Sequence, residues 1–336
     1  MADDVNRRYL LRERPDGRID KSTFELVEEP VPEAKGGQAL VQNLYLSVDP
    51  TNRAWIGEEP TYLPPVGIGD CMRSVGLGRV VSSGDPNYPE GSLVTGLVGW
   101  QDYVVTGEGE VPLTIVPDDT GLPVETLMGA LGLTGVTAYF GLLEIGEPKE
   151  GETVVVSAAA GAVGSVVGQI AKLKGCRAVG IAGGAEKCAW LVDELGFDAA
   201  IDRHDPQWKE QLRAACPNGV DVDFENVGGE IMREVFDMLN LHARVALCGL
   251  ISEYNEAERP SGPPFARVLV NRVKVQGFII LDYFGRFPEA IAQLGQWVAE
   301  GKVKDKHTVV EGLERAPDAV NMLFDGDNIG KLIVKV

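Results

Sequence analysis

The sequence predicts an α/β fold in which a doubly wound parallel sheet is joined to a mostly-β domain. Residues 1 to about 125 hold short apolar runs separated by Gly, Pro, Asp and Asn clusters. Residues 152–281 instead alternate strand-like and helix-like patterns, and a glycine-rich turn lies between the first strand and helix of this alternation. The 336 residues suffice for two domains of roughly 150 residues each.

The first region is expected to form a small barrel or sandwich, which we place at residues 1–125. Its apolar runs are Phe24–Val27, Ala39–Leu46, Val75–Val81, Ser92–Leu97, Gln101–Val105 and Leu113–Val116. Residues 122–143 then have a helical pattern and are expected to bridge the two domains.

The second region, placed at residues 126–295, has the rhythm of a doubly wound sheet. Its predicted strands are Thr153–Val156, Arg177–Ile181, Ala199–Asp202, Val220–Asn226, Ala243–Cys248 and Val273–Ile280. Its predicted helices are Val163–Lys174, Ala185–Leu195, Trp208–Cys216, Gly229–Leu239 and Phe287–Glu300. Helical crossovers between parallel strands build such a sheet. Residues 296–336, with a helix near 316–323 and a strand at 331–336, are expected to return to the first domain.

The glycine-rich turn predicts dinucleotide binding. It follows the β-branched run Thr153–Val156, holds Gly161 and Gly164 and opens the helix at Val163. Small residues allow the backbone to approach a pyrophosphate, whose charge the helix N-terminus then stabilises. The pattern A-x-x-G-x-x-G lacks the first glycine of the usual fingerprint, so tight helix–strand packing in any α/β protein is the alternative interpretation.

The residues after the second predicted strand favour NADP over NAD. In the NAD version of this fold, an acidic side chain about 20 residues beyond the glycines binds the ribose 2′-hydroxyl. Here Gly183 and Gly184 occupy that tip, and Lys187 and Arg203 follow. Two cations suit a 2′-phosphate. Ordinary solvated surface cations are the alternative, and Glu186 could reach the same place.

Composition excludes several classes of protein. The formal charge of −19 argues against nucleic acid or an anionic membrane as partner. Five scattered cysteines without C-x-x-C spacing favour reduced, cytoplasmic thiols, and the N-terminal residues show no signal-peptide pattern. No run reaches the roughly 18 apolar residues of a membrane span.

Motifs for other chemistries are missing. The first region holds one cysteine, Cys71, and no histidine, so we expect no catalytic zinc and no other metal site. Neither the G-x-S-x-G elbow nor the P-loop is present, which removes hydrolase and NTPase interpretations.

Tyr254 is the candidate catalytic residue. Hydride transfer to a double bond conjugated with a carbonyl leaves negative charge on an enolate oxygen, which needs a hydrogen-bond donor and a proton source. Tyr254 follows the fifth predicted strand, whose end faces the ligand crevice in such sheets. A loop tyrosine that only packs is the alternative.

Several segments resemble one family. They are Tyr45–Pro50, Gly99–Val104, Leu133–Leu142, Ala158–Lys172, Glu225–Glu230, Cys248–Asn255 and Gly326–Lys331. Together they are similar to the zinc-independent medium-chain dehydrogenase/reductases, within the prostaglandin reductase and alkenal double-bond reductase branch that includes bacterial curcumin reductases.

The resemblance implies a GroES-like domain, a Rossmann domain, a homodimer and NADPH-dependent reduction of α,β-unsaturated aldehydes and ketones. It also implies roles for single residues: Gly161–Gly164 at the pyrophosphate, Lys187 at the 2′-phosphate and Tyr254 at the enolate. The other implied cofactor contacts are Asn226, Cys248, Gly249, Leu250, Ile251, Ser252, Tyr254, Phe278, Ile279, Ile280 and Asn328, with Ala162 and Val163 inside the turn.

Two positions depart from the family pattern. Relatives commonly carry a tyrosine where this chain has Arg203, and an aromatic residue and a methionine or similar residues where it has Thr51 and Asn52. The sequence therefore predicts an enone or enal reductase. A quinone reductase of the same fold and a non-catalytic NADPH-binding protein of crystallin type are the alternatives.

Overall fold

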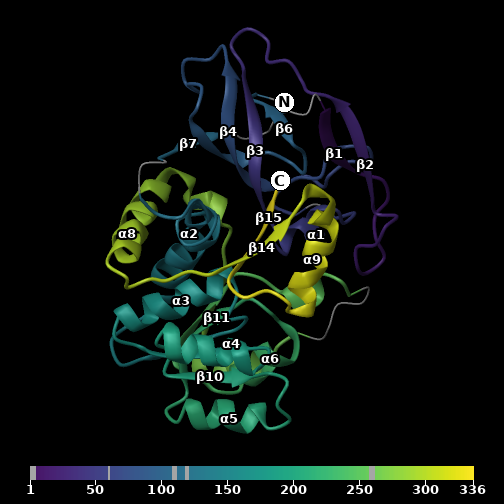
Figure 1. The fold of residues 1–336 in the computed structure, drawn as a ribbon. Helices are drawn as coiled ribbons and strands as arrows, with labels where there is room; N and C mark the ends of the chain where they lie inside the picture. The colour runs from purple at the N-terminus through teal and green to yellow at the C-terminus, as the bar shows by residue number, and fades with distance from the viewer. Residues whose placement is uncertain (1–4, 60, 108–111, 118–120, 257–261) are drawn as a thin grey trace. The chain divides into compact units, whose positions relative to one another are not determined.

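The computed structural model describes residues 5–59, 61–107, 112–117, 121–256 and 262–336, which divide into two compact units (Figure 1). The first unit comprises residues 1–124, 308–327 and 332–336, and the second comprises 125–307 and 328–331. The tail beyond residue 296 is thus shared between the units, whereas the sequence-based division gave all of it to the first. Residues 333–335 of the tail pair with a strand of the first unit. Gly330 and Lys331 instead donate hydrogen bonds to residues of the second unit.

The first unit is mostly β. Its strands are β1 (Val5–Leu11), β2 (Phe24–Pro30), β3 (Ala39–Ser47), β4 (Val75–Ser83), β5 (Leu93–Leu97), β6 (Tyr103–Val105), β7 (Thr114–Val116), β14 (His307–Glu311) and β15 (Lys331–Lys335). One sheet has the order β14-β15-β3-β4-β5-β7, with β6 also on β3. Strands β1 and β2 form a second sheet, and β1 also makes single bridges through Arg8 to Gln101 and through Leu10 to Cys71. The last strand, β15, runs antiparallel to β3. The helices here are α1 (Thr51–Trp55) and α9 (Ala316–Asp325).

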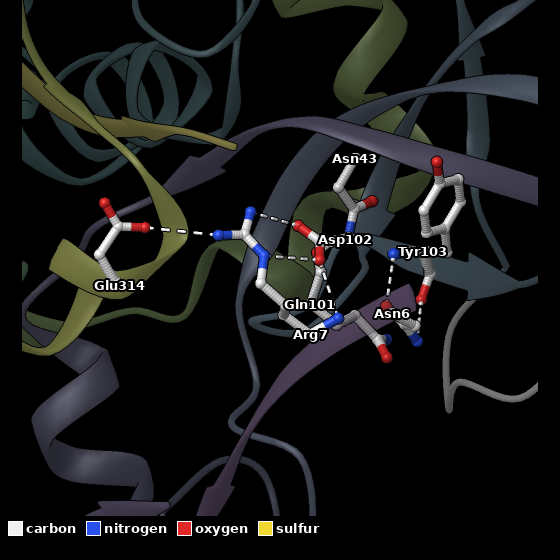
Figure 2. A network of polar contacts seen from close by, with 7 residues as sticks. All are labelled: Asn6, Arg7, Asn43, Gln101, Asp102, Tyr103 and Glu314. Carbon is white, nitrogen blue, oxygen red and sulfur yellow. Dashed lines mark hydrogen bonds and ion pairs between the residues drawn. The ribbon is translucent and has the colours of Figure 1, made fainter. Parts of the chain in front are cut away.

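A polar network holds β1 in this unit (Figure 2). The Arg7 guanidinium donates to both carboxylate oxygens of Asp102, each at 2.9 Å, and the Arg7 backbone N–H donates to the same carboxylate at 2.8 Å. The Asn6 side chain donates to the Tyr103 carbonyl and accepts from the Tyr103 N–H. The sequence did not predict this strand, because the hydrogen-bond partners of its polar residues lie nearly a hundred positions further along the chain.

The second unit confirms the predicted doubly wound sheet. Its strands are β8 (Thr153–Val156), β9 (Arg177–Ala182), β10 (Ala199–Asp202), β11 (Val220–Glu225), β12 (Leu239–Leu247) and β13 (Lys274–Gly277). All pairings are parallel, in the order β10-β9-β8-β11-β12-β13. The order reverses between β8 and β11, and such switch points open a crevice for ligands.

Helices surround this sheet (Figure 1). They are α2 (Leu133–Phe140), α3 (Ala162–Leu173), α4 (Ala185–Ala189), α5 (Trp208–Ala215), α6 (Gly229–Phe236), α7 (Phe265–Asn271) and α8 (Phe287–Ala299). The predicted helices 122–143 and 185–195 are each interrupted. In the first, a 3₁₀ turn (Val124–Leu127) precedes α2 and a π-helix (Gly141–Gly146) follows it, and in the second a π-helix (Trp190–Glu194) follows α4.

The core of the sheet contains the carboxyl group of Asp223. Asp223 on β11 is fully buried, with Val155 and Val245 as its neighbours on the two flanking strands. Neither carboxyl oxygen has a hydrogen-bond partner among the described residues. Burial, and then the nearby Glu225 carboxyl, raise the pKa of Asp223 well above its ordinary value. Asp223 is therefore expected to be neutral in the folded protein and ionised in the unfolded chain near neutral pH.

Asp223→Val is expected to raise the free energy of unfolding by about 1–3 kcal/mol at pH 8. Because the folded protein holds a proton that the unfolded chain releases, stability falls as pH rises above the unfolded pKa. The variant loses this part of the pH dependence. Urea unfolding at pH 5, 7 and 9 measures both effects, and parallel stability–pH curves for the two proteins would contradict the assignment.

Candidate functional site

The residues singled out in the sequence gather at the carboxyl ends of the parallel strands of the second unit. Gly161 follows β8, Arg203 follows β10, and Asn226 follows β11. The segment 248–254 follows β12, and Phe278, Ile279 and Ile280 follow β13. In open α/β sheets ligands bind at this edge.

The turn after β8 fits a pyrophosphate. Gly161 is the N-cap of α3, and Ala162, Val163 and Gly164 form its first turn, whose N–H groups have no acceptor within the helix. A Cβ on Gly164 would lie 2.5 Å from the Ala158 carbonyl oxygen, so glycine is needed for the helix to start this close to the strand. Gly161 and Ala162 are partly exposed, which leaves these donors accessible to an anion.

Beside the turn lies the carboxylate of Glu225. Its Oε1 accepts from the Ser157 hydroxyl at 2.7 Å and from the backbone N–H groups of Val227 and Gly228. The Ser157 hydroxyl in turn accepts from the Asn226 N–H at 2.7 Å, and the Asn226 amide donates to the Ser157 carbonyl at 2.8 Å. The ends of β8 and β11 are thereby tied together on either side of the switch point.

A segment distant in sequence completes the turn. Gly330 donates its N–H to the Ala160 carbonyl at 2.8 Å and forms a parallel bridge with Gly161. The Asn328 amide donates to the Gly330 carbonyl at 2.9 Å, and Asn328 is buried. This places Asn328 next to the glycine turn, as the resemblance implies for a cofactor contact.

One cavity of about 430 Å³ is lined by the predicted contacts Cys248, Gly249, Leu250, Tyr254, Phe278 and Ile279, together with Leu247, Gly277 and Asp282. The Tyr254 hydroxyl accepts from the Leu250 N–H at 3.3 Å. Burial raises the pKa of Tyr254, so its hydroxyl keeps its proton at neutral pH. Burial also raises the pKa of the Cys248 thiol to about 12, which makes this cysteine a poor nucleophile.

Ile251 and Ser252 instead contact the residues that directly follow the carboxyl end of β11. Their N–H groups donate to the carbonyls of Asn226 and Val227, at 3.1 and 3.0 Å. The Ser252 hydroxyl donates to the Val227 carbonyl at 2.6 Å. These bonds fix the loop that carries Tyr254. Ile280 begins a 3₁₀ helix (Ile280–Arg286) beside the cavity, but it is not one of the described residues that line the cavity.

Sequence reasoning missed the Ser157–Glu225 tie. A glutamate directly before Asn226, at the end of a strand that alternates Val and Asp before Phe224, was the available signal. In the first unit, Asn52 is buried, its oxygen accepts the Asp49 N–H at 2.8 Å and its amide donates to the Arg73 carbonyl at 3.1 Å. Asn52 therefore shapes the start of α1.

The described residues contain neither a cluster of metal ligands nor a membrane-spanning helix. Among them, no group of three or more His, Cys, Asp or Glu side chains is arranged to hold a metal ion. No helix in the described ranges is both long and apolar enough to cross a membrane.

The fold and this site define a nucleotide-dependent oxidoreductase. Residues 7–113 match the model for the N-terminal domain of oxidoreductase, and residues 162–296 match the model named zinc-binding dehydrogenase. The NADPH-dependent curcumin reductase of Escherichia coli is 46% identical over 98% of this chain and 97% of its own length. The NADP-dependent 2-alkenal reductase of Nicotiana tabacum is 37% identical over 100% and 99%.

A solved structure agrees with these relatives. The crystal structure of CurA from Vibrio vulnificus in complex with NADPH has a TM-score of 0.92 and 43% identity, covering 98% of this chain and 99% of that one. The chain belongs to the zinc-independent medium-chain dehydrogenase/reductases, in the branch of prostaglandin and alkenal double-bond reductases. The predicted family and fold class are confirmed.

Gly164→Ala is expected to weaken NADPH binding and to lower the free energy of unfolding by about 1–3 kcal/mol, because the new methyl group meets backbone atoms that cannot move aside. Gly295→Ala in α8 is the matched control. Its Cβ would meet only Leu131 at 4.0 Å, so binding stays unchanged and stability rises by up to about 1 kcal/mol. Fluorescence titration and thermal unfolding measure both, and equal behaviour of the two variants would contradict the turn's role.

Proposed function

We propose that this protein reduces the carbon–carbon double bond of α,β-unsaturated aldehydes and ketones, with NADPH as the reductant. The proposal is supported by the whole-length similarity to the curcumin and 2-alkenal reductases. The structural observation that carries it is a protonated tyrosine, Tyr254, in the wall of the cavity built by the predicted cofactor contacts.

When bound, NADPH supplies a hydride, which we assign to the β-carbon of the substrate. The negative charge then resides on the enolate oxygen, where a hydrogen-bond donor is needed. Tyr254 fills this role, because the Leu250 N–H already occupies one acceptor position of its oxygen and leaves the O–H proton to donate. The ribose hydroxyl of a bound NADPH would be a second donor. Tyr254 or water returns a proton to the α-carbon.

Tyr254→Phe is expected to lower kcat on an enone by about 100-fold with little change in KM, since only the charge of the transition state loses its donor. Tyr88→Phe is the control, because the Tyr88 hydroxyl donates to the Leu113 carbonyl in the first unit. Steady-state kinetics distinguish them. Unchanged turnover in Tyr254→Phe would remove this tyrosine from the chemistry.

A substrate panel tests the function itself. NADPH oxidation is measured with enals, enones, quinones and simple aldehydes, and the products are identified. The proposal expects saturated aldehydes and ketones from enals and enones. Robust quinone turnover with little on enals would indicate a quinone reductase, and tight NADPH binding without any turnover would indicate a non-catalytic nucleotide-binding protein.

We also propose a homodimer formed through α7 and β13. On α7, Phe265, Leu269 and Val270 are 68%, 78% and 63% exposed. Strand β13 is an edge of the six-stranded sheet, and within the described residues its one partner strand is β12. An edge strand beside an apolar surface is suited to pair with its own copy about a two-fold axis.

Unpaired buried thiols such as Cys216 support a reducing compartment, which we propose is the cytoplasm.

Leu269→Glu is expected to shift the protein from dimer to monomer, because the charge would be buried at the interface. Val192→Glu is the control, as Val192 is an exposed apolar residue, 40% accessible, on the π-helix Trp190–Glu194, which lies by β10 at the opposite edge of the sheet. Light scattering after size-exclusion chromatography gives the mass. A wild-type protein that is monomeric at micromolar concentration would contradict the dimer.

A further inference from the structure

Two side chains lie over the glycine that ends β9. A Cβ built on Gly183 would be 3.0 Å from Cε1 of His204 and 3.2 Å from Nε of Arg203. Nε2 of His204 would be 3.5 Å from the same point. Glycine at this position therefore leaves the space above the strand tip to an imidazole and a guanidinium, both of which carry N–H donors.

The backbone holds both residues in place. The Arg203 N–H donates to the Ala182 carbonyl at 2.8 Å. Asp202 Oδ1 accepts the N–H groups of Gly184 and His204, at 2.8 and 3.0 Å. Burial alone would raise the pKa of Asp202, but these backbone donors outweigh it and the pKa lies below its ordinary value. Oδ1 of Asp202 thus serves the loop itself.

The orientation of the imidazole follows from the same contacts. Nδ1 of His204 lies 3.7 Å from the Asp202 carboxylate, while Nε2 lies on the Gly183 side. The side chain is 56% exposed, so a ligand can reach it. Lys187 and Glu186 on α4 are the other charged groups of this corner.

In doubly wound folds this strand tip meets the 2′ position of the adenine ribose. A carboxylate that binds the 2′-hydroxyl would select NAD, but Oδ1 of Asp202 is engaged by the N–H groups of Gly184 and His204. The nitrogen donors beside it suit a phosphate. We propose that His204 binds the 2′-phosphate of NADPH through Nε2 and acts with Arg203 as the NADP selector of this chain. The inference rests on the proposed cofactor and adds a residue that the sequence pattern did not single out.

The test measures binding without substrate. Dissociation constants for NADPH and NADH come from fluorescence titration, and that of adenosine 2′,5′-bisphosphate comes from calorimetry. In His204→Ala the constants for NADPH and the bisphosphate are expected to rise about five- to tenfold, the loss of one charge-assisted hydrogen bond, while NADH is unaffected. Lys187→Ala, at the position assigned to the same phosphate, is the positive reference.

His242→Asn is the matched control. His242 lies near the start of β12, at the opposite end of the sheet from the site, and its φ of 62° is one that asparagine tolerates. This variant should bind all three ligands like the wild type. His204→Lys, which restores a cationic donor, should recover most of the lost affinity.

Two outcomes would overturn the inference: wild-type affinity for the bisphosphate in His204→Ala, or equal weakening of NADPH and NADH, which would mark a purely structural role. A failure of the proposed reductase activity looks different. It would leave the NADPH–NADH difference in binding intact while no enone is reduced.

Discussion

The tie between Ser157 and Glu225 is the interaction on which the rest of the site depends. The strand order reverses between β8 and β11, and a crevice opens there because neighbouring connections leave in opposite directions. Glu225, at the end of β11, links the two strands because it accepts a hydrogen bond from the Ser157 hydroxyl after β8. It also accepts hydrogen bonds from two backbone N–H groups of its own loop. Burial raises the pKa of Glu225 above its ordinary value, and these donors only partly offset that rise.

Each part of the site is attached to this tie by short contacts. Asn226 bonds to Ser157 on one side and receives the Ile251 N–H on the other, which fixes the loop leading to Tyr254. The glycine turn begins directly after Ser157, and residues 328–331 close it from outside through Ala160. The glycine turn and Tyr254 are thereby set on one edge of the sheet, as the proposed hydride transfer requires.

Local patterns sufficed for the elements whose own residues determine them. Strand β8 was predicted to the residue because its β-branched run is buried on both faces, and α3 to within one residue because its apolar positions repeat with helical spacing. Strand β1 was missed, since its polar residues are satisfied only by Asp102 and Tyr103. The π-helix after α4 was also missed, because tertiary packing produces it and no local signal marks it.

The site divides in the same way. Gly161, Lys187 and Tyr254 could be singled out because motif spacing and strand ends carry information. Glu225 and His204 could not be singled out, because their proposed roles depend on neighbours that only folding brings close. Glu225 contacts Ser157, and His204 lies beside Gly183. Asp223 shows the reverse case, an ionisable residue in a strand pattern whose burial in the core raises its pKa well above the ordinary value.

Isotope labelling tests the central claim most directly. An enone is reduced with NADPH that carries deuterium at the transferred position of the nicotinamide, and the product is examined by NMR. The account predicts a saturated ketone with deuterium on the former β-carbon, and incorporation at the α-carbon only when the solvent is D₂O. Deuterium on the carbonyl carbon, in an allylic alcohol, would contradict it.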